Sequence, residues 1–523
     1  MPNDTTEQNS RVEPVVKKLP LGQTRFLIPI GLLVILVVVL GVGPVDDTYI
    51  FLRYARNIAT GVGPVFNVGE RVEGFSSPLW TFLLGGLGTW VDLEWLAYLF
   101  GIFFAGLCLA AATAWCHDRA ESGIEARILM LGLASCPVLV FAAGSGMDTA
   151  LFAALTTLSI ASALADLRRG TLSTRTVILL LLATLTRSEG LLLAAFTTLF
   201  LLAHRRNVRR ITLFFICVAA LHLVRYAYYG SWVPNTAYAK IAFALPERLD
   251  RGFRYLGSAL VCAVPLLPLG WMIAVAGIRA APAARQRWAF LTLWVLLYTA
   301  YVAYVGGDNI PAFRIFLPVL PAMCLLVAES WTPALQGWTA GRRRAALALL
   351  VMAVASANVF TYRRVSKAYF ADMRLATAWT RVGKWVDEHT PPDTILATPV
   401  VGAIGYFGQR TTIDMLGLTD KTVARDGRVY PKAAHGHARY HTDHILACNP
   451  DLILYMSSGR FTEPVYSSPD RIHKPTGYAL YDLVTDPRTK RRYAYETAQL
   501  SDGTLVEMLT RKDTARSAMT WDK

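Results

Sequence analysis

Long apolar runs separated by short polar segments fill the first two thirds of the chain. Each run approaches the roughly 20 apolar residues that a helix needs to cross the hydrocarbon core of a bilayer. The runs cover residues 26–42, 96–115, 129–143, 149–165, 211–229, 256–275, 288–305, 316–331 and 345–360. A further run at 177–203 is interrupted by Arg187 and Glu189, which predicts two short helices that meet near 186–190. With segment 78–90 taken as a partial or re-entrant element, the pattern predicts about eleven transmembrane helices.

After residue 361 the pattern changes. Apolar stretches shorten to strand length at 394–398, 411–415 and 451–456, and amphipathic helical patterns lie at 370–389 and 440–448. Short apolar strands that alternate with helices indicate a small α/β domain. We therefore predict a polytopic α-helical membrane protein with three parts: a disordered cytoplasmic tail at 1–23, a transmembrane module at 24–361 whose first extracytoplasmic loop is 44–78, and an extracytoplasmic α/β domain at 362–523.

The composition agrees with this interpretation. Hydrophobic residues make up 54% and charged residues 17% of the chain, whereas an average soluble domain is about 25% charged. The net charge of +15 does not indicate a nucleic-acid partner. Arginines gather in pairs and triplets, as at 168–169, 205–206 and 342–344, which is typical of cytoplasmic loops. We expect a multi-pass protein of the bacterial inner membrane with a cytoplasmic N-terminus and a periplasmic C-terminal domain.

The polar segment after the first apolar run carries the densest candidate chemistry. Asp46 and Asp47 are adjacent at the predicted membrane surface, where burial and mutual repulsion raise the pKa of at least one carboxyl. Such a pair can act as a general base or hold a divalent cation. The alternative is that Asp46 caps a helix beginning near Thr48 and Asp47 complements its dipole. The surrounding glycines, arginines and glutamates favour the functional interpretation.

Further loops place polar groups on the same predicted face. They are GSGMDT at 144–149, TRSEG at 186–190, PNTAYAK at 234–240 and GGDNIPAFR at 306–314. Helices of about twelve residues rise only ~18 Å, so Arg187 and Glu189 should lie below the membrane surface. They form either a structural ion pair or part of a ligand site. Lys240 and Arg314 either bind phosphate or lie at the membrane interface with their charges toward water.

Two groups of aromatic and imidazole side chains have simpler interpretations. The tyrosines are more typical of an interfacial belt than of sugar-stacking platforms: Tyr226, Tyr228, Tyr229 and Tyr238. The histidines lack a standard zinc-ligand spacing and are interpreted as solvated surface or as contacts to an acceptor: His435, His437, His441 and His444.

The loop motifs resemble a known family. DDTYIxxRYARN at 46–57, followed by GxGxVFNxGERVEGFSSPLW at 61–80, resembles the first extracytoplasmic loop of bacterial GT-C glycosyltransferases. More narrowly, the chain is similar to the terminal arabinofuranosyltransferases of mycobacterial-type cell walls and to their relatives that modify pili or surface glycans. The resemblance continues through TRSEG, YYGSWVPNTAYAK at 228–240, VGGDNIPAFRIFLP at 305–318 and IDMLGLTD at 413–420.

The resemblance implies transfer of a sugar, D-arabinofuranose in the narrower family, from a polyprenyl phosphate in the outer leaflet to an extracytoplasmic glycan or protein acceptor. Asp46 or Asp47 would be the base. Phosphate-binding candidates are Arg53, Arg56, Lys240 and Arg314. Residues expected to contact sugar hydroxyls or orient the cations are Glu70, Glu73, Asp148, Arg187, Glu189, Asn235 and Asp308. No cofactor is required, although a divalent cation could bind Asp46 and Asp47.

Two alternatives remain at this stage. The same chemistry could move another sugar, such as mannose or an aminopentose, to lipid or protein. A non-enzymatic transporter or flippase for a lipid-linked glycan would also have many crossings and charges within the membrane. Alternating access, however, predicts polar residues near the midplane and internal repeats, whereas the polar groups of this chain gather on one face.

Overall fold

The computed structural model describes residues 24–117, 124–204, 208–240, 243–263, 282–335, 337–434, 436–454, 469–500, 503 and 505–513. The predicted tail at 1–23 and the second half of the run at 256–275 lie outside these residues. The long helices are α1 (Thr24–Val39), α2 (Asp46–Ala59), α3 (Pro78–Leu87), α4 (Leu93–His117), α5 (Ile124–Ala134), α6 (Pro137–Gly144), α7 (Thr149–Arg169), α8 (Thr174–Thr186), α9 (Glu189–His204), α10 (Val208–Tyr229), α12 (Leu245–Ala263), α14 (Pro282–Val305), α15 (Val319–Ala334) and α16 (Ala340–His389).

Shorter elements follow or connect these helices. The short helices are α11 (Asn235–Lys240), η2 (Arg314–Phe316), α17 (Ala403–Gly408), α18 (Lys421–Asp426), α19 (Thr442–Ala447), η4 (Pro469–Arg471), α20 (Lys474–Thr485) and α21 (Pro487–Arg492). The strands are β1 (Ile395–Thr398), β2 (Thr411–Asp414), β3 (Arg428–Val429), β4 (Arg439–Tyr440), β5 (Leu452–Leu454), β6 (Tyr493–Gln499) and β7 (Leu505–Arg511).

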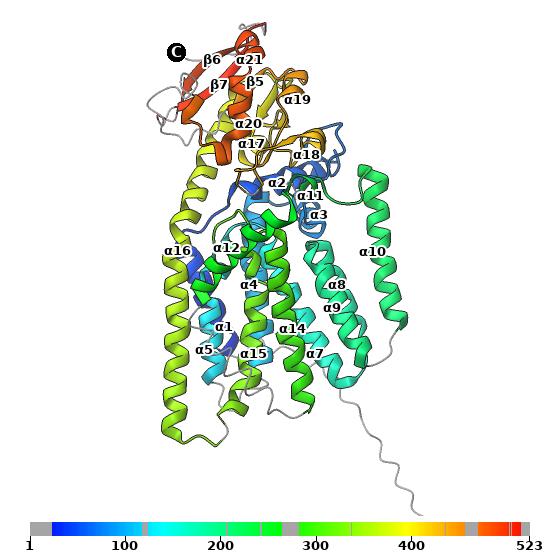
Figure 1. Cartoon of the computed structure of the whole chain (residues 1–523), viewed down its shortest axis with the longest axis vertical. Coiled ribbons are helices and arrows are strands. Elements are labelled where there is room, and N and C mark those ends of the chain that lie inside the picture. The colour runs from blue at the N-terminus through cyan, green and yellow to red at the C-terminus, as the bar shows by residue number, and fades with distance from the viewer. Residues whose placement is uncertain are drawn as a thin grey trace, which may run out of the picture.

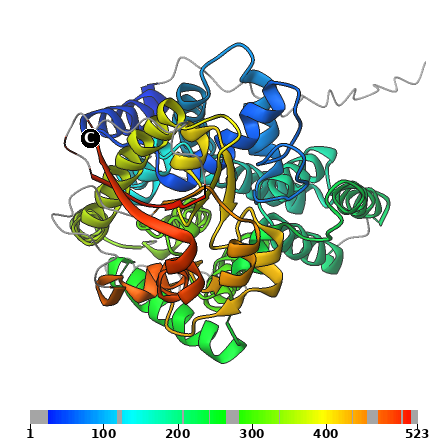
Figure 2. The same ribbon diagram turned by 90° about the horizontal axis from the view of Figure 1, so that it is seen from above.

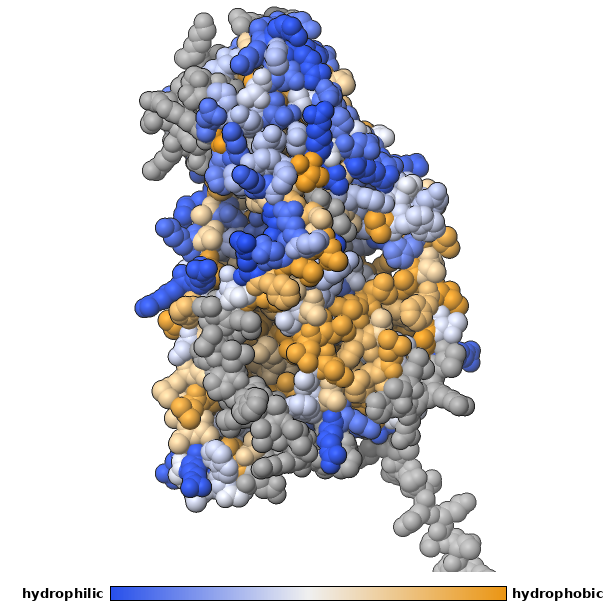
Figure 3. All heavy atoms as spheres, in the orientation of Figure 1, coloured by the Kyte–Doolittle hydropathy of each residue, from blue (hydrophilic) through white to orange (hydrophobic). Residues whose placement is uncertain are grey.

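The apolar runs form a helical bundle below a polar C-terminal region (Figure 1). Among the described residues, five helices are long and apolar enough to cross a membrane: α4, α7, α10, α14 and α16. The pair α5 and α6, bent by 50°, adds a sixth if it is one span. Figure 3 shows apolar atoms over the bundle and polar atoms over the C-terminal region. The protein is therefore a multi-pass membrane protein, and the count of about eleven crossings stays a prediction.

Several runs form helices shorter than a full crossing. Helices α1, α3, α8, α9 and α15 are apolar segments of 10–17 residues. The interrupted run at 177–203 is divided as the charges predict, because α8 ends at Thr186 and α9 begins at Glu189. Segment 78–90 contains α3, which packs against α2 and α4.

Helix α16 connects the bundle to the C-terminal region. Its 50 residues are continuous, so the boundary predicted at residue 362 falls inside a helix. The N-terminal part of α16 packs against α5 and α6, and α17 packs against both α16 and α2. The Tyr369 hydroxyl, near the middle of α16, donates a hydrogen bond of 3.0 Å to the Gly43 carbonyl. This helix therefore fixes the position of the C-terminal residues above α2.

The C-terminal residues form a mixed five-stranded sheet in the order β2-β1-β5-β7-β6. Strands β2, β1 and β5 are parallel, and β7 pairs antiparallel with β5 and β6. Strands predicted at 394–398, 411–415 and 451–456 are present as β1, β2 and β5. The hairpin of β6 and β7 was not predicted. Seen from above, these strands lie over the helical bundle (Figure 2).

Candidate functional site

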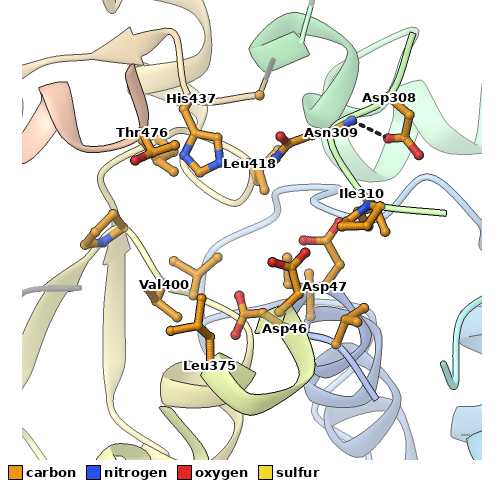
Figure 4. A pocket seen from close by; sticks show the side chains of 18 of the residues that line it. Asp46, Asp47, Asp308, Asn309, Ile310, Leu375, Val400, Leu418, His437 and Thr476 are labelled. Carbon is orange, nitrogen blue, oxygen red and sulfur yellow. Dashed lines mark hydrogen bonds between the residues drawn. The ribbon is translucent and has the colours of Figure 1, made fainter. Parts of the chain in front are cut away.

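A cavity of about 360 Å³ lies where the N-terminus of α2 meets the C-terminal residues. We call it the main cavity. Its floor is formed by Asp46 and Asp47, and the loop at 308–314 forms one wall. Leu375 and Trp379 of α16 line it as well, and His437 and Thr476 lie across from the two aspartates (Figure 4). Segments far apart in the chain therefore meet at this one site.

The two adjacent aspartates open helix α2. Val45 occupies the N-cap position, so α2 begins at Asp46 and not near Thr48. The alternative in which Asp46 caps a later helix is therefore wrong, because both carboxylates lie in the first turn, where they complement the helix dipole. Asp46 Oδ1 accepts a hydrogen bond of 2.8 Å from the Ala403 amide. Burial raises the pKa of Asp46 to about 7 despite that bond, and the charge of Asp47 adds to the rise.

Two cations face these carboxylates. Lys240, the last residue of α11, and Arg314, the first residue of η2, both line the main cavity. Arg314 Nε donates to Asp308 Oδ2 at 2.6 Å. Although burial acts in the opposite direction, this contact and Lys240 hold the pKa of Asp308 well below its usual range. Both cations therefore line the same cavity as the two aspartates, and the alternative of an interfacial position stays open.

A smaller cavity of about 40 Å³, the side cavity, adjoins the main one. Asp47, Lys240 and Arg314 line both cavities, and Asp148 and Arg187 line only the side cavity. Arg187 therefore forms the expected ion pair and also lines a cavity, while its ligand role stays a prediction.

Arg187 is held between two buried carboxylates. Its guanidinium lies 3.0 Å from Glu189 and 3.4 Å from Asp148. The Ser188 hydroxyl donates a further hydrogen bond of 3.2 Å to Glu189. Paired in this way, the charges fix the junction between α8 and α9 at the edge of the site.

Six residues predicted for the site line neither cavity: Arg53, Arg56, Glu70, Glu73, Glu189 and Asn235. Glu189 is linked to the side cavity only through its ion pair with Arg187. Arg53 donates to the carbonyls of residues 66, 405 and 410 and lies over the Phe66 ring, so its guanidinium ties the first loop to the C-terminal residues. Arg56 lies over the Tyr406 ring. Glu73 pairs with Arg225 at 2.7 Å.

Glu70 and Asn235 also lie away from the cavities. Glu70 is exposed and accepts a hydrogen bond from Asn67 of the same loop at 3.0 Å. Asn235 Nδ2 donates to the carbonyls of Gly417, Leu418 and Asp420. The amide of Asn235, which was expected to contact substrate, therefore joins α11 to the C-terminal region.

Most of the lining of the main cavity was not predicted, including Asp372, Trp379 and His437. Asp372 and Trp379 lie on α16, where the amphipathic pattern gave no sign of a cavity. His437 is half-buried in the cavity wall, and partial burial lowers its pKa. Its Nε2 lies 3.2 Å from Asn309 Nδ2.

The other histidines of this cluster have different surroundings. His444 Nε2 lies 2.9 Å from Asp420 Oδ2 and therefore links α19 to α18. His441 faces a separate cavity of the C-terminal region. His435 lies outside the described residues.

Solved structures share this architecture. The crystal structure of ArnT from Cupriavidus metallidurans bound to undecaprenyl phosphate matches with a TM-score of 0.58 and 12% identity, covering 93% of this chain and 98% of that one. The apo oligosaccharyltransferase of Archaeoglobus fulgidus matches with a TM-score of 0.51 and 12% identity, covering 94% of this chain and 74% of that one. The chain has the GT-C glycosyltransferase fold.

Sequence comparison finds curated relatives with a more specific activity than the shared fold indicates. Terminal β-(1→2)-arabinofuranosyltransferases of Corynebacterium glutamicum and Mycobacterium tuberculosis are 29% and 28% identical to this chain over 350 and 294 residues. These matches cover 55% and 51% of this chain and 49% and 47% of the relatives, so the chain spans about half of their length. A family model described as a domain of unknown function, DUF8728, matches residues 367–504. The matches confirm the resemblance seen in the loop motifs.

On this GT-C scaffold the main cavity brings two carboxylates and two cations to one place. A base with a pKa near neutrality accepts a proton efficiently at physiological pH. Cations in a site with little water stabilise developing negative charge strongly. Within the described residues, no group of three or more histidine, cysteine or acidic side chains converges as a metal site. A divalent cation at Asp46 and Asp47 stays a prediction.

Proposed function

We propose that this protein transfers a sugar from a polyprenyl phosphate to a hydroxyl group of an extracytoplasmic acceptor. The observation that carries the proposal is the main cavity, which Asp46 and Asp47 line together with Lys240 and Arg314. A transferase of this kind needs a base for the acceptor and positive charge for the departing phosphate. The two carboxylates and the two cations line the same cavity, at the polar end of a bundle of apolar helices.

Lys240 and Arg314 would bind the donor phosphate. Both line the main and side cavities, so a phosphate between them would also face Asp47. Arg314 donates to Asp308 from Nε at 2.6 Å and from Nη2 at 3.3 Å, and its Nη1 contacts Met147 Sδ at 3.0 Å. It would hold the phosphate with its remaining N–H donors. The undecaprenyl phosphate bound to ArnT, which shares the fold, supports a lipid-linked donor.

In the proposed reaction, the acceptor oxygen attacks the anomeric carbon of the donor sugar. Its proton passes to the carboxylate of Asp46 or Asp47 as the new glycosidic bond forms. The bond between the anomeric carbon and the phosphate oxygen breaks, and the lipid phosphate leaves with its added charge beside Lys240 and Arg314. Asp148 and Arg187 line the side cavity, where they would contact sugar hydroxyls, and Glu189 would orient Arg187 through their ion pair.

We infer D-arabinofuranose as the sugar and a cell-envelope glycan or glycoprotein as the acceptor. The similarity to two terminal arabinofuranosyltransferases supports this choice over mannose or an aminopentose. The arginine-rich loops support a bacterial inner-membrane protein with a cytoplasmic N-terminus. That orientation would place the main cavity on the periplasmic side, where lipid-linked sugars and not nucleotide sugars are available.

The decisive experiment supplies purified protein in membranes with radiolabelled polyprenyl-phosphate arabinofuranose and an arabinan acceptor. We expect labelled product from the wild type and loss of product from both Asp46→Asn and Asp47→Asn. Asp250→Asn is a matched control, because Asp250 forms an exposed pair with Arg254 on α12. Transfer by both site variants at the wild-type rate would refute the base assignment. A parallel assay supplies radiolabelled polyprenyl-phosphate mannose, and transfer from that donor alone would refute the assignment of arabinofuranose.

A further inference from the structure

A second cavity, of about 290 Å³, lies in the C-terminal region. We call it the polar cavity. Its lining consists of charged, hydroxyl and aromatic side chains, including Tyr440, Thr442, Asp443, Asp482 and Arg488. This set contains hydrogen-bond donors and acceptors side by side. Such a lining suits a neutral ligand that is rich in hydroxyl groups.

The polar groups of this cavity are held in place by one another. The Thr442 hydroxyl donates to Asp482 Oδ2 at 2.6 Å, and Arg488 contacts both Asp443 and Asp486, at 2.5 and 2.7 Å. A carboxylate has about four lone-pair positions, so Asp482 retains acceptor capacity beyond its bond with Thr442. Preorganised groups of this kind bind a ligand at a lower entropic cost.

Helix α20 connects the polar cavity to the main cavity. Thr476, near its N-terminus, lines the main cavity, and Asp482 and Thr485, near its C-terminus, line the polar cavity. Helix α20 is kinked at Gly477, and the regular helix from Tyr478 to Thr485 rises roughly 10 Å at 1.5 Å per residue. A few linked sugar rings can cover this distance.

Aromatic side chains lie between the two cavities. Tyr478 of α20 stacks on Tyr430 with ring centroids 3.9 Å apart, and Tyr440 meets Tyr478 edge-on at 5.0 Å. Tyr478, Asp482 and Thr485 have the i, i+4, i+7 spacing of one helix face. These contacts occupy the Tyr478 ring itself, so a glycan would meet the parts of the half-buried cluster that stay accessible, where tyrosines offer apolar ring surface together with hydroxyl groups.

We propose that the polar cavity is a distal binding site for the acceptor glycan, several sugar rings away from the reacting hydroxyl. The chain would run from the main cavity along the Tyr478 face of α20 and end against Asp482 and Thr442. This inference rests on the proposed glycosyltransferase function. It adds that the protein prefers a long oligosaccharide acceptor over a short one.

The test compares two synthetic acceptors, an arabinofuranose disaccharide and an octasaccharide, in steady-state transfer assays. Asp482→Asn keeps the side-chain shape and removes the charge. We expect it to raise KM for the octasaccharide about tenfold, the effect of losing roughly one hydrogen bond to a charged group, with kcat unchanged. Neither constant should change for the disaccharide, which cannot reach the polar cavity.

Two further variants keep the test decisive. Thr485→Arg fills the mouth of the cavity from an exposed position and should raise the octasaccharide KM even if Asp482→Asn folds poorly. Asp470→Asn, an 89% exposed carboxylate on η4, should have no effect on either acceptor. An equal change for both acceptors, or none for the octasaccharide, would overturn the inference while leaving the proposed function intact. Failure of the wild type to glycosylate either acceptor would instead refute the proposed function.

Discussion

Replacing Asp46 by Asn should remove transfer activity and at the same time stabilise the folded protein. Burial raises the pKa of this carboxyl from 3.8 to about 7. The folded protein must therefore hold a charge at neutral pH that the unfolded chain holds more easily. Asn has the same shape, and its Oδ1 can accept the hydrogen bond that the Ala403 amide donates to Asp46.

The size of the stabilisation follows from the pKa difference. Each pKa unit corresponds to about 1.36 kcal/mol, so a shift of about three units sets an upper limit of about 4 kcal/mol. The sign follows from linkage: a folded-state pKa above the unfolded value makes the wild type lose stability as pH rises from 3.8 through about 7. The advantage of Asp46→Asn should therefore be largest above pH 7 and should shrink as pH falls toward 4.

Thermal unfolding in detergent micelles at several pH values measures this difference, and transfer assays on the same preparations measure activity. In the wild type, kcat/KM should fall about tenfold per pH unit below about 7 if Asp46 is the base. Asp47→Asn serves as the matched neighbour. A variant Asp46→Asn that is less stable than the wild type above pH 7 would refute the burial argument. If Asp46→Asn stays active and its kcat/KM still falls below about pH 7, another group accepts the proton.

Three further predictions test the rest of the site. Lys240→Met should lower kcat about 10²- to 10³-fold, because one preorganised positive group is lost. Lys384→Met, on the exposed side of α16, should leave kcat unchanged. Equal rates for the two variants would contradict a phosphate-binding role for Lys240. Arg53→Met should lower the free energy of unfolding by at least about 3 kcal/mol, because several buried carbonyls lose their hydrogen-bond donor. Arg56→Met should lower it by only about 1 kcal/mol. Chemical denaturation of the two variants measures both free energies. EDTA treatment should leave the transfer rate unchanged, because the side chains of Lys240 and Arg314 would already supply positive charge to the donor phosphate. A loss of rate that Mg²⁺ or Ca²⁺ restores would instead place a metal ion at the aspartate pair.

Local patterns predicted much of the helical framework. The break between α8 and α9 follows from two charges inside one apolar run, and the strands β1, β2 and β5 follow from short apolar stretches. The hairpin of β6 and β7 escaped prediction because its stability depends on pairing β7 with β5, more than 50 residues earlier in the chain. Hydropathy along a segment carries no information about such a partner.

The amino-acid sequence by itself determined which segments are apolar helices and which loops carry charges, because hydropathy and helix period are properties of neighbouring residues. It also identified Asp46 and Asp47 as the centre of the site. Only the tertiary structure decided which cations face that pair. Arg53 lies two helical turns after Asp46 on α2, which is about 10 Å along the helix. Its guanidinium donates hydrogen bonds to carbonyls of the C-terminal region. Lys240 and Arg314 reach the cavity from distant segments, because packing and not sequence distance brings charges together.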